Sequence, residues 1–148
     1  MKPRVGGANL SFSIPNSLEE VTPACCRIET FLNEHDAHPR VVYCTQLVFE
    51  ELATNIIRHA FSDDQRHEIS IGVMLDNDSV RMTVEDDGDA FDPDSWQPDS
   101  PGSLEEAELG GRGLLLVRRM SDDFSINRES DRNVCRVKIT VPAENKEQ

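Results

Sequence analysis

A long amphipathic helix is the clearest element that the pattern of apolar and polar residues predicts. From about residue 40 to residue 61, apolar residues recur at intervals of three and four, or at sums of these, which is the spacing of one helix face. This face consists of Val41, Val48, Leu52, Ile56 and Ala60. A shorter helix is predicted to end before His38-Pro39, and its buried face consists of Val21, Cys25, Ile28, Phe31 and Leu32.

The start of the shorter helix has two interpretations. Asn16 or Ser17 is suited to cap a helix, and a glutamate at position 19 or 20 would complete a capping box. Thr22-Pro23 also fits a cap followed by the first helical residue, and proline is awkward in a helix interior. The pattern leaves both starts open.

Alternation of apolar and polar residues predicts strands on both sides of these helices. The first strand covers residues 10–14 and is closed by Pro15. After the long helix, residues 69–75 and 80–84 predict a β-hairpin that turns at Asp76-Asn77-Asp78.

A second hairpin is predicted near the end of the sequence. Residues 124–126 and 134–141 carry its apolar positions, and a turn is expected near residues 130–133. Its last strand either pairs with the first strand of the chain or lies beside the central hairpin.

These elements fit one domain, because 148 residues are enough to bury most of their apolar surface. We expect residues 9–142 to form it, between a loose lead-in over residues 1–8 and a frayed tail over residues 143–148. Residues 94–110 carry several breakers and no periodicity, which is typical of a mobile lid.

Charge and composition narrow the function classes. The net charge of -13 argues against a nucleic-acid partner, because proteins that bind phosphate backbones concentrate positive charge. No run approaches the roughly 20 apolar residues of a membrane span, so no membrane association is predicted and we expect a cytoplasmic protein. The four cysteines show neither a disulfide framework nor a CxxC metal pair, so they are interpreted as reduced.

Candidate chemistry begins on the polar side of the long helix. Glu51, Asn55 and His59 are spaced four apart, so their side chains project from one stripe beside the apolar face. Carboxylate and amide oxygens on one rigid face suit Mg2+, and a carboxylate also accepts a proton. An ordinary solvated helix face would explain the same residues, and only later segments favour a site.

Two later segments have the character of ligand-binding loops. The second strand of the central hairpin runs into Asp86-Asp87-Gly88, which places a carboxylate at the sheet edge beside a glycine that a ligand can approach closely. Gly110-Gly111-Arg112-Gly113-Leu114 then opens a predicted helix, whose free backbone N–H groups suit a phosphate. The order of helix, strand end, lid and glycine loop is more specific than any of its parts.

In this order the chain resembles the GHKL (Bergerat-fold) ATP-binding superfamily, and within it the bacterial anti-sigma-factor serine/threonine kinases. The segments that carry the resemblance are Glu51-Leu52-Ala53-Thr54-Asn55 with His59-Ala60 (N box), Asp86-Asp87-Gly88 with Phe91-Asp92-Pro93 (G1 box) and Gly111-Arg112-Gly113-Leu114 (G2 box). The resemblance runs from Leu10 to Val141. It implies an α+β fold, a two-layer α/β sandwich whose mixed, mostly antiparallel sheet has helices packed on one face.

The resemblance also implies roles for these residues. Asn55 would hold the Mg2+ that bridges the ATP phosphates, and Asp86 would accept a hydrogen bond from the adenine amino group while Gly88 lets the ring approach. Glu51 would be catalytic and take the proton from an attacking hydroxyl. The residues that would bind the phosphates are Gly111, Arg112, Gly113 and Leu114.

Some positions depart from the family pattern or have simpler explanations. Ala90 stands where many members have a second glycine, and Asp89 is an unusual acid beside a nucleotide. His59 is also explained as a buried, hydrogen-bonded histidine, and Asp92 as a cap or turn residue. Glu50 is a rival base, but it points about 100° away from Glu51 around the helix.

The resemblance implies an ATP-dependent protein serine/threonine kinase that acts as an anti-sigma factor. Its expected partners are a sigma factor or similar regulator, which it sequesters, and an antagonist of the STAS fold, which it phosphorylates. The alternative is an ATP-binding regulatory module without phosphotransfer activity, and Glu51 argues against it because a pure binder needs no base. A homodimer is expected from the resemblance alone.

Overall fold

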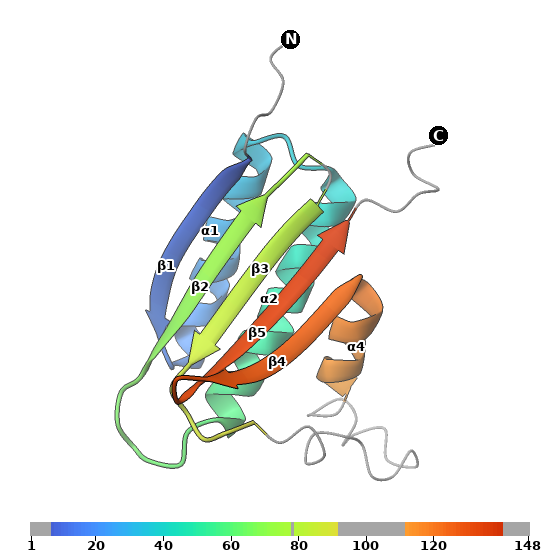
Figure 1. Ribbon diagram of the computed structural model, residues 1–148. Coiled ribbons are helices and arrows are strands. Elements are labelled where there is room, and N and C mark those ends of the chain that lie inside the picture. The colour runs from blue at the N-terminus through green and yellow to red at the C-terminus, as the bar shows by residue number, and fades with distance from the viewer. Residues whose placement is uncertain (1–6, 78, 92–111, 141–148) are drawn as a thin grey trace.

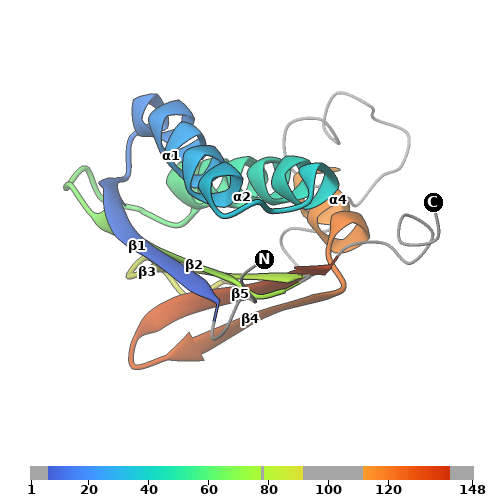
Figure 2. The same cartoon turned by 90° about the horizontal axis from the view of Figure 1, so that it is seen from above.

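The computed structural model describes residues 7–77, 79–91 and 112–140, and these form two layers (Figure 1). Five strands make one sheet in the order β1-β2-β3-β5-β4. They are β1 (Ala8–Pro15), β2 (Glu68–Leu75), β3 (Ser79–Asp86), β4 (Asp123–Glu129) and β5 (Arg132–Thr140). The α-helices of the described part are α1 (Val21–Glu34), α2 (Pro39–His59) and α4 (Arg112–Met120), and all lie on one face of the sheet (Figure 2). The expected α+β sandwich is confirmed.

Every pairing between described strands is antiparallel, so the expectation of a mixed sheet is wrong for this part of the chain. The reason lies in the connection from β3 through α4 to β4. β4 runs in the same direction as β3 but does not pair with it. β5 lies between these two strands and pairs antiparallel with both. The last strand therefore lies beside the central hairpin, which was the second of the two arrangements left open.

The two hairpins turn close to where the sequence predicts. Between β2 and β3, the backbone N–H of Asp76 donates to the carbonyl of Ser79 at 2.8 Å. Between β4 and β5, Ser130 and Asp131 have φ angles of 52° and 65°, as a two-residue type I′ turn requires. The expected turn over residues 130–133 is thus shorter, and Asn133 is the second residue of β5.

The helices begin near the capping residues and prolines of the sequence. A 3-10 turn (Leu18–Glu20) follows Ser17 and leads into α1, although the Ser17 side chain makes no capping hydrogen bond. Pro23 is the third residue of α1, where its missing N–H breaks no helical hydrogen bond. α2 begins at Pro39, and the imidazole Nδ1 of His38 caps it by accepting from the Arg40 N–H at 3.0 Å. The α-helix therefore begins at Val21, between the two starts considered, and only the 3-10 turn follows Ser17, without the expected side-chain cap.

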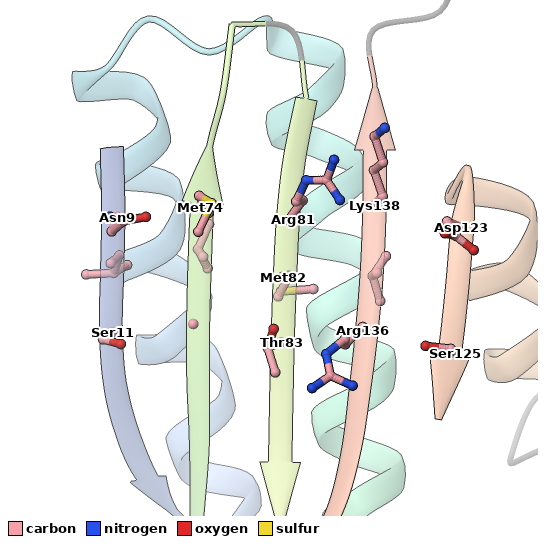
Figure 3. A pocket seen from close by; sticks show the side chains of 14 residues that line it. Asn9, Ser11, Met74, Arg81, Met82, Thr83, Asp123, Ser125, Arg136 and Lys138 are labelled. Carbon is pink, nitrogen blue, oxygen red and sulfur yellow. The ribbon is translucent and has the colours of Figure 1, made fainter. Parts of the chain in front are cut away.

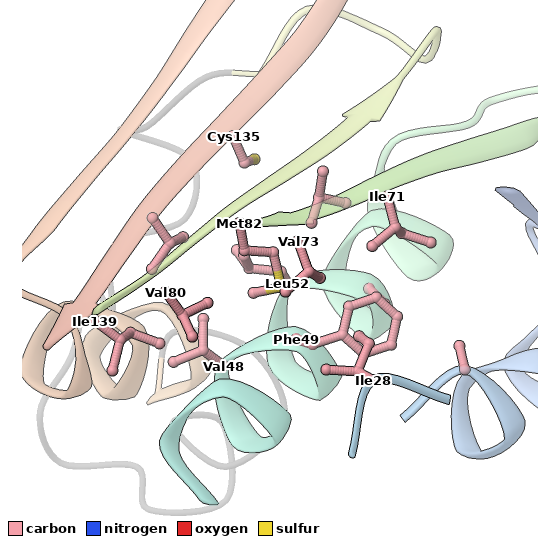
Figure 4. Close-up of a cluster of buried hydrophobic side chains, with 14 of the residues drawn as sticks. Ile28, Val48, Phe49, Leu52, Ile71, Val73, Val80, Met82, Cys135 and Ile139 are labelled. Carbon is pink, nitrogen blue, oxygen red and sulfur yellow. The ribbon is translucent and has the colours of Figure 1, made fainter. Parts of the chain in front are cut away.

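The core lies between the helices and the inner face of the sheet (Figure 4). On α2, Val48 and Phe49 are 0% exposed and Leu52 is 3% exposed. They face the alternate apolar side chains of the central strands, which are Ile71, Val73, Val80, Met82 and Ile139. Because these residues repeat with period 2 on the strands and with the helical period on α2, the two surfaces bury each other along their length.

The other face of the sheet carries no described helix. It forms a hollow of about 630 Å³ whose rim is polar and charged (Figure 3). Side chains at this hollow include those of Asn9, Ser11, Met74, Arg81, Thr83, Arg136 and Lys138. Among the described residues, none of those expected to bind a nucleotide lines it.

The packing of Phe49 predicts a large stability effect. Phe49→Ala should lower the free energy of unfolding by about 3–5 kcal/mol, because it leaves a cavity at a fully buried position. Tyr43, which lies on the same helix but is 57% exposed, provides the control: Tyr43→Ala should change the free energy by less than about 0.5 kcal/mol. Urea unfolding followed by circular dichroism measures both, and equal effects would contradict this packing.

Candidate functional site

Several chain segments that are far apart in sequence meet at one end of the molecule. Figure 1 shows that α2 ends, β3 ends, α4 begins and β5 begins at this end. The segments that follow α2 and β3 are in direct contact, because the backbone N–H of Asp89 donates to the carbonyl of Ala60 at 2.7 Å. α4 also packs against α2. The elements that carry the predicted helix, strand-end and glycine-loop motifs are therefore neighbours.

Exposure differs among the three residues of the polar stripe on α2, and Asn55 in its middle is the most buried. Asn55 is 6% exposed, and its Nδ2 has no hydrogen-bond partner among the described residues. Glu51 is half-buried and Glu50 is exposed, which is the orientation expected for this pair. His59 is exposed, so the interpretation of His59 as a buried histidine is wrong.

Asn55 is the described residue best suited to contact a ligand at this end. A buried amide nitrogen without a partner costs free energy, so the Nδ2 donor of Asn55 is available to an acceptor on a bound group. The described residues contain no group of three or more His, Cys, Asp or Glu that could hold a metal ion by themselves. A hard cation here would therefore need oxygen ligands from a bound phosphate in addition to the Asn55 amide, which fits Mg2+ with a nucleotide.

Asp86 is a buried carboxylate at the end of β3, with an exposed fraction of 1%. Its Oδ1 accepts hydrogen bonds from the Gly88 N–H at 2.8 Å and from Asn133 Nδ2 at 2.9 Å. Burial raises the pKa of Asp86, and these two hydrogen bonds oppose the rise because they favour the charged form. No hydrogen bond from the described residues reaches its Oδ2.

Gly88 is required by the protein itself at this contact. A Cβ at position 88 would lie 2.4 Å from the carbonyl oxygen of Ala60 and 2.8 Å from its Cβ. The prediction from sequence was that this glycine lets a ligand approach, and that role stays a prediction. The structure adds a second reason, because only glycine lets residues 86–91 pack against the end of α2.

His67 ties the segment before β2 to the end of β3. Its Nε2 lies 2.8 Å from Asp63 Oδ1, and its Nδ1 lies 3.0 Å from Asp87 Oδ1. The ring stacks on Phe61 with 4.4 Å between centroids. The hydrogen bonds to Asp63 and then to Asp87 raise the pKa of His67, while desolvation opposes them. Protonation of His67 therefore strengthens the connection to the residue next to Asp86.

The glycine-rich motif is only partly within the described residues. α4 begins at Arg112, so Arg112, Gly113 and Leu114 form its first turn, as the sequence predicts. Gly111, Asp92 and the expected lid over residues 94–110 lie outside the described residues, as do the predicted tail and most of the lead-in. The phosphate-binding role of these residues stays a prediction.

Sequence reasoning missed three residues of this region: His67, Arg128 and Asn133. Asn133 was included in a turn, whereas the structure places it on β5 directly opposite Asp86. Asparagine is depleted in strands, so a buried asparagine there signals a special role, but only the strand register identifies its partner. His67 stands in a loop with no pattern around it, and no local signal distinguishes it.

Comparison with known proteins agrees with this geometry. The family model of the histidine kinase-like ATPase domain matches residues 14–139. The chain belongs to this family. The match begins in β1 and ends in β5, so it includes the helix with Asn55, the strand end with Asp86 and α4. The superfamily resemblance is confirmed.

Curated relatives within this family are named serine-protein kinase RsbW. The protein from Bacillus subtilis (strain 168) is 30% identical over 98 residues, which is 63% of this chain and 61% of the relative. The protein from Oceanobacillus iheyensis is 30% identical over 91 residues, which is 57% of this chain and 56% of the relative. The matches thus span less than two thirds of the length of these kinases.

Two solved structures share the fold of this chain. The RsbU and RsbW domains of Rv1364c from Mycobacterium tuberculosis match with a TM-score of 0.66 at 14% identity, covering 92% of this chain and 34% of that chain. The blue-light activated histidine kinase EL346 of Erythrobacter litoralis matches with a TM-score of 0.56 at 21% identity, covering 86% and 43%. At these identities the likeness establishes the fold alone.

Within the described part of this ATPase-family chain, no helix combines the length and the apolar character needed to cross a membrane.

The close approach at Gly88 predicts that a methyl group is not tolerated there. Gly88→Ala should lower the free energy of unfolding by about 1–3 kcal/mol, because the backbone of Ala60 must move. Gly72→Ala is the matched control: a Cβ at position 72 meets nothing within 4 Å, so its stability should be equal to or above that of the parent. Urea denaturation of both variants is the measurement, and a Gly88→Ala protein as stable as the parent would refute the contact.

The hydrogen bonds of His67 predict a pH-dependent stability. The pKa of His67 is raised above its usual value of 6.5, so its contribution is complete below that pH and is lost as the pH rises through the raised pKa. His67→Gln should therefore destabilise the protein more at about pH 5.5 than at about pH 8.5. Urea unfolding at both values tests this, with His35→Gln as a control histidine outside the cluster. An equal loss of unfolding free energy at both pH values would show that the charge on His67 does not contribute to stability.

Proposed function

We propose that this protein is an ATP-dependent protein serine/threonine kinase that acts as an anti-sigma factor. Two observations carry the proposal together: the buried Asn55, whose Nδ2 has no described partner, lies in the last two turns of α2, and the buried Asp86 carboxylate ends β3. α2 and β3 end at the end of the molecule where α4 begins. Membership of the histidine kinase-like ATPase family supports ATP as the ligand. The RsbW relatives support protein phosphorylation as the reaction.

Each proposed role follows from the environment of the residue. Asp86 is an acceptor whose Oδ2 is free of described hydrogen bonds, which suits the amino group of adenine. Asn55 lies on the rigid helix α2 and contacts the phosphate side of the nucleotide. The first turn of α4, with Arg112, Gly113 and Leu114, offers backbone N–H groups to the phosphates together with Gly111.

Glu51 is the proposed general base. It stands four residues before Asn55, one helical turn away on the same stripe, and it is only half-buried, so a substrate hydroxyl has access to it. A carboxylate within hydrogen-bond reach of the hydroxyl takes its proton as the phosphoryl group is transferred. Phosphoryl transfer otherwise depends on positioning and charge stabilisation, which a rigid helix and an array of backbone amides supply.

Asn55 is the residue that would hold Mg2+ together with the phosphate oxygens. When bound, the cation neutralises the charge of the phosphates. This assignment fits the chemistry of the amide oxygen and the absence of a self-sufficient acidic cluster among the described residues.

The proposed partners come from the family resemblance. A sigma factor is sequestered, and a STAS-fold antagonist receives the phosphate on a serine or threonine. The bulk of the surface charge is negative, which is consistent with protein partners rather than nucleic acid. The proposed assembly is a homodimer.

The proposed base predicts a separation of binding from transfer. Glu51→Gln should bind Mg-ATP within about twofold of the parent and transfer phosphate roughly 100 to 10 000 times more slowly, because general-base catalysis contributes that range. Binding is measured by isothermal titration calorimetry, and transfer by incorporation of labelled phosphate into a purified STAS-fold antagonist.

Glu50→Gln is the matched control, since Glu50 is the adjacent carboxylate and is exposed. It should leave both quantities unchanged. Equal, measurable transfer by the parent and by Glu51→Gln would exclude Glu51 as the base. ATP binding without any transfer by the parent would favour the nucleotide-binding module without kinase activity, and a parent that does not bind ATP would end the proposal.

A further inference from the structure

Asn133 and Arg128 hold the segment that carries Asp86, called here the Asp86 loop (residues 86–91). We propose that Asn133, supported by Arg128, is a positioning residue that turns the second carboxylate oxygen of Asp86 toward the amino group of a bound purine, and so sets the preference of the site for adenine. This rests on the proposed function, because it assumes that a nucleotide base occupies this site.

The side chain of Asn133 contacts the Asp86 loop at three points. Its Nδ2 donates to Asp86 Oδ1 at 2.9 Å and to the carbonyl of Asp89 at 2.8 Å. Its Oδ1 accepts from the Phe91 N–H at 3.0 Å. Asn133 is 3% exposed, so these bonds form out of contact with bulk water, where each unmade bond costs the most.

Arg128 determines which way the Asn133 amide points. Its Nη1 donates to Asn133 Oδ1 at 3.2 Å and to the carbonyl of Gly88 at 2.9 Å. A guanidinium only donates, so it requires the amide oxygen on its side and leaves the amide nitrogen for Asp86. The strand register supports this arrangement. Asn133 on β5 lies opposite Arg128 of β4 on one side and opposite Asp86 of β3 on the other.

The hydrogen-bond donors around Asp86 all bind one of its carboxylate oxygens and leave the other without a described hydrogen bond. Oδ1 receives both Asn133 Nδ2 and the Gly88 N–H, whereas no hydrogen bond of the described residues reaches Oδ2. A carboxylate held by one oxygen has a fixed plane, so Oδ2 presents an acceptor in one direction. A purine with an amino group at position 6 donates to that acceptor, and a purine with a carbonyl there places two acceptors together.

The test removes the amino group from the ligand and the positioning residue from the protein. ATP and purine riboside triphosphate, which lacks the amino group, are titrated into each protein by calorimetry. For the parent, loss of the amino group should weaken binding by roughly tenfold or more, since the hydrogen bond is to a charged acceptor. For Asn133→Leu the difference between the two nucleotides should fall below about threefold, because the freed carboxylate no longer aims at the amino group. A purely structural role would instead weaken both nucleotides equally and keep their ratio.

A second variant and a control complete the design. Arg128→Leu changes an exposed side chain, so it is expected to fold even if Asn133→Leu does not, and it should reduce the same ratio to an intermediate value. Arg132→Leu is the control. Arg132 carries the same charge in the same hairpin, but it pairs with Glu85 at 3.2 Å rather than with the Asp86 loop. It should keep the ratio of the parent.

The outcomes separate this inference from the proposed function. A parent protein that binds neither nucleotide would overturn the proposed function. A parent that binds ATP, but whose ratio is near one or is unchanged in Asn133→Leu and Arg128→Leu, would overturn the positioning role alone.

Discussion

The packing of α2 along the inner face of the sheet is the interaction on which the rest of this molecule depends. Val48, Phe49 and Leu52 pack one face of the helix against the central strands. Burial of each large apolar side chain contributes roughly 1.5–3 kcal/mol to the stability of the fold. Once that face is packed against the sheet, the direction of every other side chain on α2 is determined. Asn55 and Glu51 are therefore held in place by residues that have no part in the proposed chemistry.

The end of the protein where α2 and β3 end concentrates polar groups that a core would normally exclude. Asp86 and Asn133 are almost fully buried and hydrogen-bonded to each other, whereas the Nδ2 of Asn55 has no described partner. Buried polar groups in a low-dielectric setting stabilise strongly when they are paired and destabilise when they are not. The unpaired Nδ2 of Asn55 thus destabilises the free protein, and a ligand that accepts a hydrogen bond from this amide would remove the destabilisation.

The Asp86 loop is held from two directions by different parts of the chain. On one side, Ala60 and His67 connect it to the end of α2 and to the segment before β2. On the other side, Asn133 and Arg128 connect it to the β4–β5 hairpin. A loop fixed at both sides is rigid before any ligand binds, and such preorganisation reduces the ordering cost of binding.

The sequence by itself determined the elements of this protein and the residues of its main motifs. Helical spacing placed α2 and its Glu51-Asn55 stripe, and alternation placed both hairpins, because these periods are local properties of the chain. Only the tertiary structure decided that β5 lies between β3 and β4, that the described sheet is entirely antiparallel, and that Asn133 faces Asp86. It also brought His67 to Asp87 across 20 residues. Such pairings depend on which distant surfaces bury one another, and local patterns hold no information about the register that results.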